Sequence, residues 1–173
     1  MKQHIRYFAL AALMVVCQIL LSEYVNIWAV LYIAIFPQFI ILLPPSMNRP
    51  LHLIVAFLLG LCIDLLADGV LGLNAAALVA MAYARPFILK LTLSKGNMDN
   101  AEGQPLTPKT VETPKLIMLN TLMLAIFFTA YILLDSAAGF TFWYTLLKIG
   151  LCVAVNSIIT VICNIVLLDK FLR

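Results

Sequence analysis

The sequence predicts an all-α, polytopic membrane protein: a single integral membrane domain, residues 1–173, built as a bundle of about six transmembrane helices. Of the 173 residues, 64% are hydrophobic and 11% are charged, and the mean hydropathy is +1.07. A soluble domain is about half apolar and about a quarter charged, so this chain has too little polar surface to cover itself. The apolar residues recur along the whole chain in runs of about 17 or more without alternating polarity, which favours helices over an outer-membrane barrel.

Six apolar runs are the predicted transmembrane spans. The first follows basic residues, as a secretory signal would. Its apolar run is too long for most signal peptides and no good cleavage site follows it, so we expect a retained helix. Several runs are near the short end of the roughly 17–25 residues that cross a bilayer, so five spans remain an alternative to six. The predicted spans are residues 5–21, 27–43, 51–66, 70–89, 116–134 and 146–168.

The distribution of Lys and Arg predicts how the spans are oriented. If the N-terminus is cytoplasmic, ten of the eleven Lys and Arg residues lie on the cytoplasmic side or within about a turn of it. The external connections, residues 22–26, 67–69 and 135–145, then contain none. Lys148 is the exception, and its long side chain can extend outward to water. This bias predicts an even number of spans with both termini in the cytoplasm.

The longest polar stretch, residues 90–115, is predicted to be a cytoplasmic loop. It contains three prolines and charges of both signs, and few of its residues after position 92 are apolar. Such a composition cannot bury enough surface to fold alone, which favours a flexible loop over a dedicated docking motif. We expect no soluble catalytic domain at either end of the chain.

The third and fourth spans form a tight hairpin with two polar residues at similar depth. At a rise of 1.5 Å per residue, Asp64 lies about 20 Å along the third span, and Asn74 lies about 6 Å below the outer edge of the fourth. In a hydrocarbon core about 30 Å thick, these depths agree to within a turn. Because polar groups are costly to bury in a membrane, we expect Asp64 and Asn74 to form a hydrogen bond, directly or through water.

Residues at four-residue spacing form a stripe on each arm of this hairpin, and most of them are small. Small residues at this spacing let helix backbones approach closely, which is how helices associate where lipid is as apolar as Leu. We therefore expect two close-packing stripes, and a packing and docking element rather than an active site. The stripes are Ala56, Gly60, Asp64 and Asp68 on the third span, and Gly72, Ala76, Ala80 and Ala84 on the fourth.

The last span carries a second set of polar residues. Asn156, Thr160 and Asn164 lie at four-residue spacing, and Asn120 lies near the inner end of the fifth span. Amide and hydroxyl side chains commonly form hydrogen bonds between membrane helices, so this pattern favours contacts between helices over a transport path.

No group of residues predicts catalysis, a cofactor or a metal site. Asp64 and Asp68 could together approach a divalent ion, but no third carboxylate or His accompanies them. The serines and threonines of the polar segments have no neighbouring base. His4 and His52 lie at the cytoplasmic ends of spans, where we expect them to be solvated. The basic residues are dispersed without interleaved aromatics, which indicates contact with lipid and no nucleic acid.

The hairpin resembles the central signature of the MreD family of rod-shape proteins. In that family, a helix with Gly-x-x-x-Asp turns through a small loop into Gly, an apolar residue, Asn and Ala, and the next helix closes with Tyr and basic residues. The similarity covers residues 57–85, and the length, the six-span plan and the cytoplasmic termini also fit. The matching residues are Gly60 and Asp64, then Gly72, Asn74 and Ala75, and finally Tyr83 and Arg85.

This resemblance implies a non-enzymatic scaffold of the bacterial cell-elongation machinery, in the inner membrane. MreD-like proteins bind MreC and are linked to the actin-like MreB, to RodA and to a penicillin-binding transpeptidase, and they support rod shape and lateral peptidoglycan synthesis. Their helical plan is similar to that of the substrate-binding subunits of vitamin importers. The candidates for structural or partner-binding roles are Gly60, Asp64, Asp68, Gly72, Asn74, Ala76, Ala80, Tyr83, Asn156 and Asn164.

A substrate-binding membrane subunit of a small-molecule importer is the alternative function. It would share the fold with the scaffold, so the fold cannot decide between them. In an importer, Asp64, Asn74, Asn156 and Asn164 would line a polar pocket open to the outside. A sealed, well-packed outer half would favour the scaffold.

Overall fold

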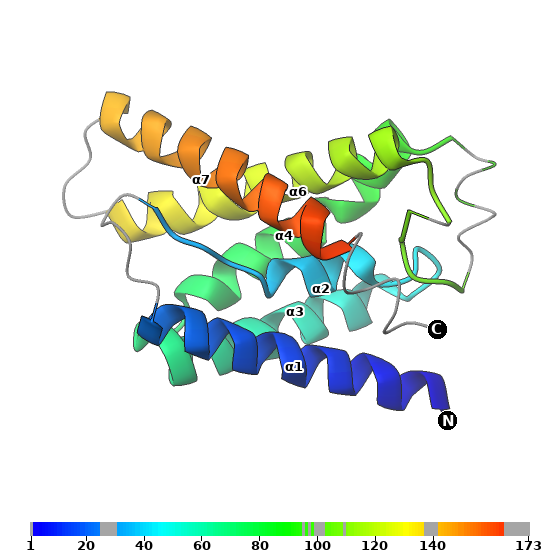
Figure 1. Cartoon of the computed structure of the whole chain (residues 1–173), viewed down its shortest axis with the longest axis horizontal. Helices are drawn as coiled ribbons and strands as arrows, with labels where there is room; N and C mark the ends of the chain where they lie inside the picture. The colour runs from blue at the N-terminus through cyan, green and yellow to red at the C-terminus, as the bar shows by residue number, and fades with distance from the viewer. Residues whose placement is uncertain are drawn as a thin grey trace.

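The computed structural model is all-helical over the residues that it describes, which are 2–24, 31–94, 96, 98, 103–108, 110–136 and 142–164 (Figure 1). No strand forms in these residues, as the sequence predicts. The elements are α1 (Lys2–Tyr24), the short α2 (Pro37–Leu42), α3 (Arg49–Ile63), the π-helical turn η1 (Asp64–Asp68), α4 (Leu73–Thr92), α6 (Thr113–Asp135) and α7 (Phe142–Cys163).

Four stretches of the described chain are helical, long and apolar enough to cross a membrane, which fits a multi-pass membrane protein. Helix α1 contributes a shorter apolar stretch, Tyr7–Glu23, which overlaps most of the first predicted span. The last four residues of the predicted span 146–168 lie outside the described residues. The four long stretches are Arg49–Ala67, Leu73–Thr92, Thr113–Asp135 and Phe142–Cys163.

The predicted second span, residues 27–43, is not a continuous helix. Residues 31–36 contain no helix, only Pro37–Leu42 is helical, and residues 27–30 lie outside the described part. Pro37 is the reason, because proline lacks the N–H that a continuing helix needs and its ring would clash with the carbonyl four residues earlier. Proline is tolerated in the first turn of a helix, where α2 places it. In Figure 1 this segment and α2 run in the direction opposite to α1.

Helix α4 lies in the middle of the bundle, between α3 and α6 (Figure 1). Helix α7 packs on the far side of α6, and α1 packs against α3. The core between these layers includes a group of aromatic rings, in which Phe36, just before α2, makes an edge-to-face contact with Phe127 of α6 at 5.5 Å between ring centroids. Both rings are fully buried.

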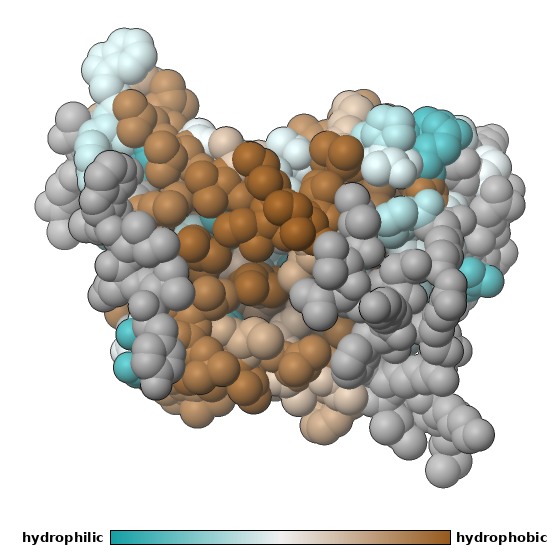
Figure 2. Space-filling view, in the orientation of Figure 1, coloured by the Kyte–Doolittle hydropathy of each residue, from teal (hydrophilic) through white to brown (hydrophobic). Residues whose placement is uncertain are grey.

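Apolar side chains also cover much of the outside of the bundle. Figure 2 shows them over the middle of one face, with polar residues toward the two ends. Large exposed apolar residues occur on every long helix, and they include Phe8, Leu58, Phe87, Leu133 and Trp143. This surface is the kind that a lipid bilayer covers and that a soluble monomer rarely exposes.

The two ends of the bundle differ in charge. The hairpin end contains the turn between η1 and α4, the end of α6 and the start of α7; there Lys148 forms an ion pair with Asp135 at 3.4 Å. The opposite end, which we call the basic end, contains the start of α3 at Arg49 and the ends of α4 and α6 that carry Lys90 and Lys115.

Candidate functional site

Asp64 is a fully buried carboxylate at the turn of the hairpin. Its Oδ2 accepts hydrogen bonds from Gly72 N at 2.8 Å and Ala75 N at 3.2 Å, and its Oδ1 accepts one from Asn74 N at 2.8 Å. These N–H groups belong to the first turn of α4, where they have no partner within the helix. Gly72 is the N-cap of α4 and has no side chain with which to cap the helix. Asp64, at the start of η1, caps α4 instead, and the helix dipole of α4 stabilises the negative charge of the carboxylate.

The predicted pairing of Asp64 with Asn74 is confirmed. Asn74 is fully buried, and its Nδ2 donates a hydrogen bond to Asp64 Oδ1 at 3.0 Å. Tyr32 of the non-helical segment 31–36 donates from its hydroxyl to Asn74 Oδ1 at 3.4 Å, and its ring stacks on Tyr131 of α6 with centroids 4.7 Å apart. A chain of contacts therefore links the hairpin to the segment 31–36 and to α6.

Gly60 lets the two arms of the hairpin come close enough for these bonds. A Cβ atom at Gly60 would lie 2.6 Å from Ala75 N and 2.9 Å from Asn74 C, and closer still to Ala75 Cα. The prediction of a close helix contact at Gly60 is therefore confirmed. We call Gly60, Asp64, Gly72, Asn74 and Ala75 the hairpin junction.

The predicted stripe of small residues on the fourth span does not face α3, so that expectation is wrong. The residue that meets Gly60 is the buried Ala75, whereas Ala76 is exposed and Ala80 and Ala84 are partly exposed. The cap is the physical reason, because α4 must be rotated so that its first-turn N–H groups point at the carboxylate. The predicted stripe instead forms an outward face of α4.

Asn156 of α7 holds one side of the extended segment 31–36. Its Oδ1 accepts a hydrogen bond from Ala34 N at 2.8 Å, and its Nδ2 donates to the Tyr32 carbonyl oxygen at 2.8 Å. The two bonds are made to residues i and i+2, as a neighbouring β-strand would make them. Non-helical backbone is tolerated at membrane depth only where such bonds satisfy it inside the protein.

Gln18 of α1 holds the other side of this segment. Its Oε1 accepts a hydrogen bond from Ile35 N at 2.9 Å, and its Nε2 donates to the Ile33 carbonyl oxygen at 2.9 Å. Backbone groups of successive residues in an extended chain point in opposite directions. Gln18 and Asn156 therefore form hydrogen bonds with alternate residues of the segment. Together these bonds replace those that a continuous helix would have made within itself.

The polar residues of the last span act between helices, as predicted, where the structure describes their bonds. Asn120 of α6 donates a hydrogen bond to the Thr160 hydroxyl of α7, and Asn156 joins α7 to the segment before α2. Asn164 is buried, and its Oδ1 has no hydrogen-bond partner among the described residues. The side chain of Asp68 lies outside the described residues.

Replacing Asn156 with Leu is expected to lower the free energy of unfolding by about 2 kcal/mol, because the Ala34 N–H loses its buried acceptor and the Tyr32 carbonyl loses one donor. The change can be measured by denaturant titration of the protein in detergent micelles. Ser157→Ala is the matched control, since the Ser157 hydroxyl has no hydrogen-bond partner among the described side chains and backbone groups. Equal stabilities of the two variants would contradict the role given to Asn156.

His52 and Arg85 are in contact at the basic end. From the sequence we expected His52 to be solvated, and that expectation is wrong, because the structure buries it. Arg85 Nη1 donates a hydrogen bond to His52 Nε2 at 2.8 Å. Since Nε2 accepts this bond, the ring proton is on Nδ1, which donates to the Asn48 carbonyl oxygen at 3.3 Å. Arg85 Nη2 donates to the carbonyl oxygens of Ile41, at 3.3 Å, and of Leu43, close to the C-terminus of α2.

The sequence did not predict the contacts made by three of these polar residues, which are Gln18, Tyr32 and Arg85. For Gln18 and Arg85 there was a usable signal, because a lone polar residue inside an apolar run is a candidate for a specific buried contact. Tyr32 carries no such signal, since tyrosine is common in apolar segments.

Among the described residues, no three His, Cys, Asp or Glu side chains are grouped so that they could hold a metal ion. Comparison of the chain with protein-family models, with curated proteins and with solved structures gives no match. The resemblance to the MreD family therefore rests on the hairpin residues themselves.

Proposed function

We propose that this protein is a non-enzymatic membrane scaffold of the bacterial cell-elongation machinery, like the MreD family that its hairpin resembles. In this role it binds the transmembrane helix of a single-span, MreC-like protein. Through the larger complex it is linked to the actin-like MreB, to RodA and to a penicillin-binding transpeptidase. The chain then crosses the bacterial inner membrane six times, with both termini in the cytoplasm.

The hairpin junction is the observation that supports this proposal best. Five of the seven residues that carry the resemblance form the hairpin junction, which holds α3 against α4 through a close backbone contact at Gly60 and a cap from Asp64. Asp64 and Asn156 direct their polar atoms at protein backbone, whereas a solute-binding subunit aims a few polar groups into a cavity. Such an arrangement favours a rigid scaffold over a solute-binding site.

In this proposal, the partner's transmembrane helix packs against an outward face of α4. It consists of Ala76, Ala80 and Tyr83, and we call it the docking face. Ala76 is exposed, Ala80 is partly exposed, and Tyr83 is 67% exposed. Small residues allow a second helix to approach closely within a membrane, and an aromatic ring beside them offers a large contact area.

Replacing Ala76 with Leu is expected to reduce co-purification with the MreC-like partner by roughly tenfold, because the added side chain holds the partner helix away from α4. The measurement is the amount of tagged partner recovered from detergent extracts. Ala154→Leu is the matched control, since Ala154 is also exposed on a long apolar helix but lies on α7. Equal recovery from both variants would contradict the docking face.

Depletion of the protein tests the function as a whole. We expect depleted cells to lose their rod shape and to widen, because lateral wall growth depends on the scaffold. Unchanged cell width together with loss of uptake of one vitamin would overturn the proposal in favour of an importer subunit.

A further inference from the structure

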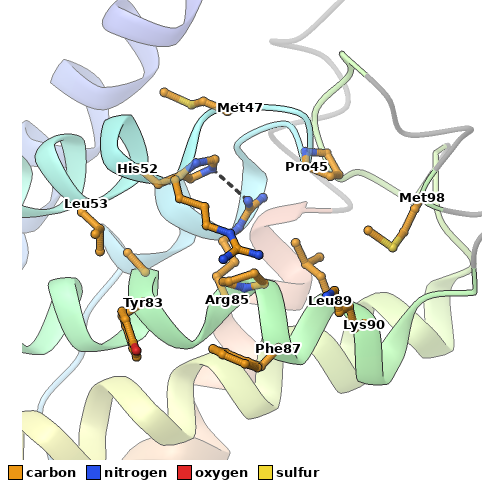
Figure 3. Close-up of a pocket in the computed structure, with 13 residues that line it drawn as sticks. Pro45, Met47, His52, Leu53, Tyr83, Arg85, Phe87, Leu89, Lys90 and Met98 are labelled. Carbon is orange, nitrogen blue, oxygen red and sulfur yellow. Dashed lines mark hydrogen bonds between the residues drawn. The ribbon is translucent and has the colours of Figure 1, made fainter.

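A pocket of about 290 Å³ opens at the basic end, between the first turn of α3 and the second half of α4 (Figure 3). Arg49 and His52 line it from α3, and Arg85 and Lys90 line it from α4. The dashed line in Figure 3 marks the hydrogen bond between His52 and Arg85. The hairpin junction lies at the other end of the same two helices, so this pocket is a separate feature.

The charged residues that line the pocket are all basic. Arg49, Arg85 and Lys90 carry positive charge, and no Asp or Glu is among the described residues that line it. The ion pairs formed within the described part of the chain, by Lys115 and by Lys148, lie outside the pocket. A concave site lined by charge of one sign attracts ligands of the opposite sign.

Arg85 is the strongest indication that an anion belongs here. Its side chain is 3% exposed, and its hydrogen bonds go to a neutral histidine ring and to two backbone carbonyls. Its Nε has no hydrogen-bond partner among the described residues. A buried guanidinium without an opposite charge is costly, and an anion in the pocket would offset that cost.

The start of α3 adds to the positive potential. The helix begins at Arg49, and the N-cap Asn48 makes no capping hydrogen bond with its side chain. The N-terminus of a helix carries a partial positive charge and free N–H groups, so it favours an anion beside it.

The outer wall of the pocket is apolar. Tyr83 and Phe87 are 67% and 66% exposed, and their ring centroids lie 6.4 Å apart along α4. Lys90 follows one turn later, at the end of a helix long enough to cross the membrane. The pocket thus combines basic side chains with exposed aromatic rings, at the depth where a lipid headgroup meets its acyl chains.

We propose that this pocket binds the phosphate of an anionic phospholipid headgroup. Arg85 lies at the buried end of the site, Arg49 and Lys90 are at its mouth, and the acyl chains pass over Phe87. Basic pockets between membrane helices are suited to such headgroups. A soluble phosphate would match the charge but would leave the exposed ring of Phe87 unused.

The test compares binding of phosphatidylglycerol and phosphatidylcholine to the full, delipidated chain in detergent, by native mass spectrometry at one ionic strength. Wild-type protein should retain phosphatidylglycerol and lose phosphatidylcholine. The double variant Arg49→Gln, Lys90→Gln should bind phosphatidylglycerol about 30-fold more weakly, since each basic side chain near a headgroup contributes a factor of about five. Both side chains are exposed, so the variant should fold normally.

Lys115→Gln is the matched control, because Lys115 is a basic residue of the same end that lies outside the pocket and pairs with Glu112 at 3.0 Å. It should bind phosphatidylglycerol like wild type. Equal retention of the two lipids, wild-type binding by the double variant, or displacement of the lipid by inorganic phosphate would each overturn the proposal. None of these outcomes affects co-purification with the MreC-like partner, so the two proposals fail independently.

Discussion

Replacing Asp64 with Ala is expected to lower the free energy of unfolding by about 4 kcal/mol. The substitution removes the carboxylate that accepts hydrogen bonds from three N–H groups at the start of α4 and from the Asn74 amide. Asn74 and Ala75 are buried at the hairpin turn, so water does not readily replace the carboxylate there, whereas Gly72 is exposed. The expected consequence is that the start of α4 frays and the α3–α4 contact loosens.

The measurement is denaturant titration in detergent micelles, with Asp135→Ala as the matched control. Asp135 is an exposed carboxylate with one ion pair at 3.4 Å, and its loss should cost less than about 0.5 kcal/mol. Asn74→Ala should cost about 1 kcal/mol, and the double variant should be less unstable than the sum of the two single changes because the residues share a bond. An Asp64→Ala variant as stable as Asp135→Ala would contradict the capping role.

The hairpin could be predicted from the sequence because its information is local. Asp64 and Asn74 are ten residues apart around a short turn, so the rise per residue fixes their relative depth. What the spacing could not provide was the rotation of α4. That rotation follows from bonds between the Asp64 carboxylate and backbone N–H groups, which carry no signature in the sequence.

The predicted second span is the opposite case, because its structure depends on residues far away in the sequence. Its apolar composition predicts a helix, and Pro37 is a visible reason for a break, but a break is only possible where other groups satisfy the freed backbone. Those groups come from Gln18 and Asn156, which are more than a hundred residues apart in the chain and have no spacing relation to the segment. The contact between His52 and Arg85 is non-local in the same way.

The buried polar residues at the hairpin turn and beside the segment 31–36 share one task, which is to satisfy backbone that leaves the regular helix. Asp64 serves the start of α4, and Gln18 and Asn156 serve the extended segment. Arg85 does the same for the end of α2 at the basic end, but it brings a full charge that its carbonyl partners do not neutralise. Because of this difference, we assign a structural role to the hairpin junction and a ligand-binding role to the basic pocket.

Replacing Gly60 with Ala is expected to destabilise the protein by about 3 kcal/mol, at the upper end of the usual cost of overpacking. The new Cβ would lie 2.6 Å from Ala75 N, and backbone cannot move aside as a flexible side chain can. The helices must separate, which lengthens the bonds from Asp64 to the first turn of α4. The variant should therefore lose both close packing and part of the cap.

Gly150→Ala is the matched control for this change, because both glycines lie inside long membrane helices and only their surroundings differ. No atom lies within 4 Å of a Cβ built at Gly150, so alanine there should leave stability unchanged or raise it by about 0.5–1 kcal/mol through its better helix propensity. Denaturant titration of both variants measures the difference. Because Gly60→Ala and Asp64→Ala act on the same junction, their double variant should be less unstable than the sum of the single effects. Strict additivity would show that the close contact and the cap are independent, and would contradict the hairpin junction as one unit.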